Sequence, residues 1–119
     1  MRFRPEQHLR LAGEIRAVRE QGRRLDCRAF TLWWKRREPA AASGARVCVI
    51  ASTAAVGAAT RRNRAKRRLR EIFRRQQQHA PQSCDLLLIA RAAAVDVPLS
   101  ELEKKFVEAC RQIEPAAKS

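Results

Sequence analysis

Acidic residues are scarce in this chain, with 12 aspartates and glutamates against 26 lysines and arginines. The resulting net charge of +14 in 119 residues exceeds what solubility requires and favours a polyanionic partner. Tyrosine is absent, and there are only two histidines. The acids are scattered and the histidines solitary, so the sequence offers no carboxylate cluster for metals and no acid–base pair. We therefore expect no catalytic residue and no metal site in the protein.

Long apolar runs are missing as well. No segment approaches the roughly 18–20 apolar residues that span a membrane, and the first residues lack the apolar stretch of a secretory signal. These absences predict a cytoplasmic protein with no membrane partner. The four cysteines form no CxxC pair and have no histidine nearby, which is not a zinc pattern. We expect them to be reduced thiols in the core or at the surface.

The apolar pattern predicts a single domain over residues 1–119, ending in a flexible tail at 115–119. Helices are expected at 5–21 and 61–78, and a last helix is expected to open at Ser100 and Glu103 as a capping box. Strands are expected at 28–36, 47–51 and 85–90, the second pairing antiparallel with the first. The order α-β-β-α-β-α predicts a mixed α/β (α+β) two-layer sandwich with a small, mostly antiparallel sheet.

The strand at 28–36 has two different faces. Alternation places Phe30, Leu32 and Trp34 on one face. Thr31 and Trp33, with Lys35, fall on the other. We expect the first face to lie in the core beneath the basic helix, and Trp33 to emerge on the second. A core position for Trp33 beneath the first helix, against Ile15 and Val18, is the alternative.

Residues 61–75 hold eight arginines and one lysine against a single acid, Glu71. Cations in the first turn oppose the helix dipole, and like charges three or four residues apart repel. Such a helix works against its own stability unless a partner with dense negative charge binds it. One apolar stripe can dock this helix on a sheet: Ala65, Leu69, Ile72 and Phe73. The opposite side is then expected to display charge to a nucleic-acid backbone, through Asn63, Arg64, Arg67, Arg70 and Arg74.

Residues 56–74 closely resemble the signature of the bacterial ribonuclease P protein component. The shared core is Arg62-Asn63-Arg64, then Lys66-Arg67, Arg70-Glu71 and Phe73-Arg74. The resemblance continues outside the helix, because residues 9–22, 30–33 and 85–90 are similar to the family's first helix, first strand and last strand.

The resemblance implies a basic protein that binds a large catalytic RNA and helps it remove the 5′ leader from precursor tRNA. Hydrolysis is then carried out by the RNA, which holds most of the Mg²⁺ ions. The family fold also implies a left-handed βαβ crossover, against the general right-handed rule. By position, the RNA contacts would be Arg62, Asn63, Arg64, Lys66, Arg67, Arg70 and Arg74. A groove for the single-stranded leader, between the first helix and the sheet, would include Thr31, Trp33, Ile15 and Arg19.

The chain departs from the family pattern at two places. Ala54 and Ala55 stand where two lysines are usual, and Ile15 and Arg19 stand where aromatic residues are usual. A ribosomal or general RNA-binding protein without a processing role is the alternative function. A DNA-binding domain fits less well, because no second helix is placed for helix-turn-helix geometry.

Overall fold

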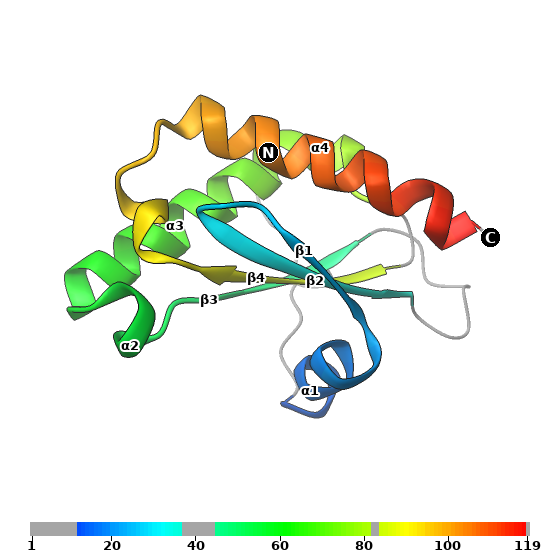
Figure 1. The fold of residues 1–119 in the computed structure, drawn as a ribbon, viewed down its shortest axis with the longest axis horizontal. Helices are drawn as coiled ribbons and strands as arrows, with labels where there is room; N and C mark the ends of the chain where they lie inside the picture. Colours follow the sequence, from blue (N-terminus) through cyan, green and yellow to red (C-terminus); the bar gives the residue numbers. More distant parts are fainter. Residues whose placement is uncertain (1–11, 37–44, 82–83, 119) are drawn as a thin grey trace.

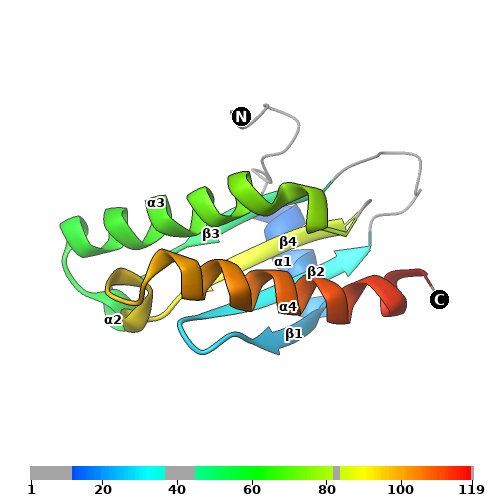
Figure 2. The same ribbon diagram turned by 90° about the horizontal axis from the view of Figure 1, so that it is seen from above.

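The structure, a computed structural model, describes residues 12–36, 45–81 and 84–118. Helices α3 (Ala59–Gln76) and α4 (Leu99–Lys118) lie side by side across one face of a four-stranded sheet, and α1 (Ala12–Gln21) lies against the other face (Figures 1 and 2). The mixed α/β class predicted from the sequence is thus confirmed. The other elements are β1 (Arg23–Asp26), β2 (Phe30–Arg36), β3 (Arg46–Ile50), α2 (Thr53–Val56), η2 (Gln77–His79), β4 (Cys84–Ala90) and η3 (Ala92–Val95).

The strands follow the order β1-β2-β4-β3 in the sheet. The pairs β1–β2 and β2–β4 are antiparallel, whereas β3 and β4 are parallel and are connected through α3. The predicted antiparallel pairing of the strands at 28–36 and 47–51 is therefore wrong. Strand β4 lies between them, because its nearly continuous buried run suits a central strand covered on both faces. The handedness of the crossover stays a prediction.

Strand β1 has no counterpart among the elements predicted from the sequence. Three of its four residues are charged and exposed, which an edge strand tolerates because its outer side faces water. The next strand begins at Phe30 and not at Arg28, because Arg28 adopts a positive φ of 66° in the connecting turn. The Asp26 carboxylate stabilises this turn by accepting a 2.8 Å hydrogen bond from the Arg28 amide.

The main core lies between the sheet and the pair α3 and α4. The predicted inward face of β2 (Phe30, Leu32 and Trp34) is at most 8% exposed. The predicted apolar stripe of α3 is also buried, and its Phe73 ring meets Phe106 of α4 edge-to-face at 6.2 Å. The alternation of β2 and the helical stripe are both confirmed. The inward residues of α4 are Leu102, Phe106, Ala109 and Ile113, with Leu99 partly buried beside them.

Three helix boundaries differ from the sequence predictions. Helix α4 already begins at Leu99, so Ser100 is a helical residue, and the Glu103 carboxylate contacts α3; the predicted capping box is wrong. The same helix continues through Lys118, so residues 115–118 are helical where a flexible tail was expected. The α-helical part of the basic segment stops at Gln76 and is followed by the 3₁₀ turn η2. Of the predicted first helix, residues 5–11 lie outside the described part of the chain.

A tight turn at Gly22 joins α1 to β1. The Gly22 amide donates to the Val18 carbonyl at 2.9 Å, which ends the helix. A Cβ atom at this position would lie 2.3 Å from the Val18 carbonyl oxygen and 2.4 Å from that of Trp34. Because backbone atoms would have to move, only glycine fits between α1 and β2.

We expect Gly22→Ala to lower the free energy of unfolding by about 1–3 kcal/mol, the usual cost of overpacking. The α1 amides should exchange with solvent faster than in the wild type. Gly13→Ala is the matched control, because nothing lies within 4 Å of a Cβ there and alanine favours the helix. Urea denaturation of both variants checks the prediction. Equal stability of the two would contradict the close approach at Gly22.

Candidate nucleic-acid interface

Helix α3 starts from a short connecting helix. The Ser52 hydroxyl caps α2 by accepting a 3.1 Å hydrogen bond from the Ala55 amide, and Gly57 then turns the chain with a φ of 103°. Helix α3 follows with no side-chain hydrogen bond at its N-cap and no acid in its first turn. Arg62, a predicted RNA contact, donates to the Thr53 hydroxyl of α2. Arginines therefore lie at the N-terminal end of α3, where the helix dipole is already positive.

One side of α3 carries most of the predicted RNA contacts. We call these residues the outer flank, and together with Glu71 they line a shallow hollow on the surface: Asn63, Lys66, Arg67, Arg70 and Arg74. Asn63, Arg67 and Arg70 are exposed. Among the described residues, no carboxylate forms an ion pair with Lys66, Arg67 or Arg70. Three adjacent cations without a counter-charge are suited to bind phosphates.

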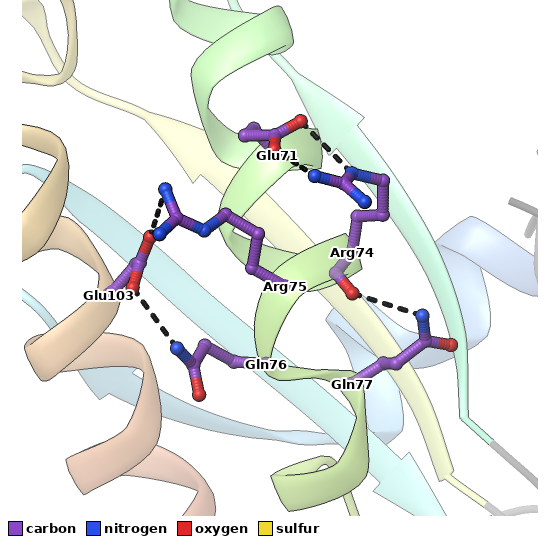
Figure 3. A network of polar contacts seen from close by, with 6 residues as sticks. All are labelled: Glu71, Arg74, Arg75, Gln76, Gln77 and Glu103. Atoms are coloured by element: carbon purple, nitrogen blue, oxygen red, sulfur yellow. Dashed lines mark hydrogen bonds and ion pairs between the residues drawn. The ribbon is translucent and has the colours of Figure 1, made fainter. Parts of the chain in front are cut away.

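Charge on the second half of α3 is partly neutralised within the protein. Figure 3 shows Glu71 paired with Arg74, and Glu103 of α4 holding both Arg75 and Gln76 at 3.0 Å. The hydrogen bond from Arg74 lowers the pKa of Glu71, so this carboxylate is charged at neutral pH. Arg74 therefore contributes less uncompensated charge to the outer flank than Arg67 or Arg70 does.

The other side of α3 faces η3 and α4. Arg64 donates from Nε to the Val95 carbonyl at 3.0 Å, and Arg68 donates from Nε to the Ala94 carbonyl at 2.9 Å. These carbonyls end a 3₁₀ helix and need donors from elsewhere. Arg64 is exposed and lies off the apolar stripe, as predicted, but it turns toward η3 and does not line the hollow with Arg67 and Arg70. We call this side the inner flank: Arg61, Arg64, Arg68 and Arg75.

Arg68 was not among the predicted site residues. Burial, followed by the neighbouring Arg64, lowers the pKa of its guanidinium, and its Nη2 atom is buried with no hydrogen-bond partner in the described structure. The spacing of four residues between Arg64 and Arg68 could have indicated that Arg68 shares a side of the helix with Arg64. The sequence alone did not show which neighbour they contact.

The predicted groove residues lie on α1 or on the face of the sheet that α1 packs against. Val18 and Leu87 form a small buried cluster there, with Ile15 and Trp33 partly buried against it. Thr31 precedes Trp33 on the same face, and its hydroxyl accepts a 3.2 Å hydrogen bond from Arg91. The structure thus brings Ile15, Trp33 and Thr31 to one side of the sheet, and Trp33 both packs against the cluster and keeps exposed surface. Arg19 is exposed on α1, in a shallow hollow shared with Ile15 and Arg16.

Strand β3 is an edge of the sheet, and helix α3 packs on it from the face opposite α1. Cys48 of β3 is partly buried on the α1 side, and burial raises the pKa of its thiol while the Arg70 charge lowers it. Partly buried apolar residues continue the surface from this edge: Cys48, Ile50 and Ile89. A flexible polyanion bound along α3 can therefore reach an apolar sheet surface at the β3 edge.

Thiols and possible metal ligands are dispersed. Cys27, Cys84 and Cys110 are buried, and burial raises the pKa of Cys27 to about 12. Within residues 12–36, 45–81 and 84–118, no three histidine, cysteine or acidic side chains come together as metal ligands. The described helices also include none with the length and hydropathy of a membrane span.

Comparisons with known proteins agree with this geometry. The family model described as Ribonuclease P matches residues 3–114. The RNase P protein from Thermotoga maritima is 26% identical, with a TM-score of 0.77 over 90% of this chain and 97% of that chain. The RNase P protein from Staphylococcus aureus is 21% identical, with a TM-score of 0.73 over 90% and 94% of the two chains, and this likeness concerns the fold alone. No individual curated protein matches the chain.

Proposed function

Because the chain belongs to the ribonuclease P protein family, we propose that it is the protein subunit of a ribonuclease P ribonucleoprotein. It would bind the ribonuclease P RNA and the 5′ leader of precursor tRNA, and so assist removal of the leader in the cytoplasm. The outer flank carries the proposal, since three of its adjacent cations, Lys66, Arg67 and Arg70, have no carboxylate counter-ion among the described residues. Bound phosphates would offset the repulsion among these cations and their unfavourable interaction with the helix dipole.

Hydrolysis is assigned to the RNA, with Mg²⁺ held mainly by its phosphates. The described protein residues do not fit a metal site, because no cluster of carboxylate, histidine or cysteine ligands is present among them. The protein's own contribution is binding and orientation: cations of α3 hold the RNA, and the surface beside α1 holds unpaired leader nucleotides. Stacking on an aromatic ring and contact with nearby cations are the usual means of holding a single strand.

The experiment that tests this function is reconstitution with a bacterial ribonuclease P RNA. At low Mg²⁺ concentration, adding the protein should stimulate cleavage of precursor tRNA at the mature 5′ end, since cations of the protein offset repulsion between the two RNAs. Protein rigorously freed of RNA should not cleave. Absence of stimulation, or cleavage by the protein alone, would contradict the proposal.

We expect Trp33→Ala to weaken binding of precursor tRNA to the assembled enzyme by roughly five- to a hundredfold, because stacking on one base is worth about 1–3 kcal/mol. Binding of mature tRNA, which has no leader, should barely change. Trp33→Phe keeps an aromatic face and should retain much of the affinity. Equilibrium binding of the two tRNAs checks this. Equal losses of affinity for both tRNAs, or a sharp fall in melting temperature, would mean that the Trp33 ring stabilises the Val18–Leu87 cluster and does not bind the leader.

A further inference from the structure

Arg46, at the start of β3, joins α1 to the sheet. It donates from Nε and Nη2 to both oxygens of the Asp85 carboxylate, at 2.8 and 2.9 Å. Its Nη2 atom also lies 2.6 Å from a Glu14 carboxylate oxygen in the first turn of α1. Asp85 is only 6% exposed. Its two hydrogen bonds therefore fix the Arg46 guanidinium on the sheet, in the position from which it contacts Glu14. A planar fork can hold two carboxylates in this way, whereas lysine is a point charge.

The apolar contact that holds α1 is small. Val18 and Leu87 are the only fully buried residues in its cluster, and most of the rest of the helix is exposed in the described structure. At the far end, the turn at Gly22 fixes α1 to β1. Glu14 lies eight residues before this turn, about 12 Å along a helix. Within the described residues, α1 is thus held at one end by the turn at Gly22 and near the other by the Glu14–Arg46 pair, with Val18 packed between them.

The position of α1 determines how much of the sheet face is open. Trp33, Cys48, Ile50 and Ile89 are only partly buried on this face. A helix pivoting at Gly22 would change the separation between Ile15 and the sheet more than it would change the packing of Val18. Loss of the pair at Glu14 would therefore widen or disorder the surface beside α1 without disturbing α3.

We propose that Glu14 and Arg46 are positioning residues that hold α1 at the separation from the sheet required to bind single-stranded leader. This inference rests on the proposed function, since it names the residues that shape the leader surface. Neither residue is expected to contact RNA. The pair acts by fixing the helix, and its removal should affect substrates with a leader and spare those without one.

Glu14→Gln and Glu20→Gln form a matched test. Both remove one negative charge from α1 beside the same sheet face, and Glu20, which lines the hollow with Arg19, forms no ion pair with the sheet in the described structure. Simple electrostatics predicts slightly tighter RNA binding for both variants, because each raises the net charge by one. We expect Glu14→Gln instead to weaken precursor tRNA binding to the holoenzyme by about three- to tenfold. Affinities for mature tRNA and for ribonuclease P RNA should stay unchanged. If the two variants bind precursor tRNA equally well, the proposal is overturned.

A second measurement is independent of RNA. Amide hydrogen exchange of the isolated protein should show faster exchange in α1 for Glu14→Gln than for Glu20→Gln, with β2 and β4 unchanged. Equal exchange in α1 would overturn the positioning role, whatever the protein binds. Wild-type holoenzyme that does not distinguish precursor from mature tRNA would contradict leader binding itself. The two failures are therefore distinguishable.

Discussion

Arg67→Gln combined with Arg70→Gln should weaken binding to ribonuclease P RNA by on the order of thirtyfold, if each lost contact with a phosphate is worth about 1 kcal/mol. The slope of log affinity against log salt should fall by roughly two, about one for each contact. Both side chains are exposed on the outer flank, so no core packing is lost. Stability should rise slightly, because two like charges three residues apart are removed. Salt titrations of RNA binding check the prediction.

The control is Lys104→Gln combined with Arg111→Gln on the exposed side of α4. It removes the same two charges, so any effect of net charge alone appears equally in both variants. We expect its affinity and salt slope to stay close to those of the wild type. If both double variants lose affinity to the same extent, the charge of the protein acts diffusely and the outer flank is not the contact surface.

Phe73→Ala should lower the free energy of unfolding by about 3–5 kcal/mol, a large part of the about 5–15 kcal/mol typical of a domain. The ring is 1% exposed and meets Phe106 edge-to-face, so its removal leaves a cavity between α3 and α4. Urea denaturation measures the loss, and Phe73→Leu should cost less because more of the volume is kept. At protein concentrations and temperatures where the variant stays folded, RNA affinity should be nearly normal. A loss below about 1 kcal/mol would place the ring outside the core.

The elements predicted well are those with a strong local pattern. The stripe of α3 and the alternation of β2 follow from side-chain periods of 3.6 and 2, and both faces were assigned correctly. The run at 85–90 indicated a covered strand, and β4 is indeed central. Strand β1 was not predicted, because Arg23-Arg24-Leu25-Asp26 is mostly charged and has no apolar alternation. Its pairing with β2 is a tertiary contact that a local pattern does not show.

The sequence pattern predicted on which face of a helix or strand most candidate site residues lie, but it did not show which residues they contact. Helical geometry placed Arg64 on the charged side, yet its bond to Val95 depends on how η3 packs, 31 residues further along the chain. The same holds for Arg46, which reaches Asp85 across 39 residues. Glu103 matched a capping box locally, but Arg75 and Gln76 of α3 offer its carboxylate a charged partner and an amide (Figure 3). Tertiary contacts of this kind override local signals.

The most direct test of the outer flank is photo-cross-linking from single uncharged positions. A benzophenone attached to Asn63→Cys on the outer flank, or to Gln112→Cys on the exposed side of α4, leaves the charge of the protein unaltered. The background variant Cys48→Ser removes the one partly exposed native thiol, and protein is kept in excess over RNA. We predict cross-links to ribonuclease P RNA from position 63, suppressed by unlabelled wild-type protein, and few from position 112. Equal cross-linking from both positions, or cross-linking from position 112 alone, would contradict RNA binding by the outer flank of α3.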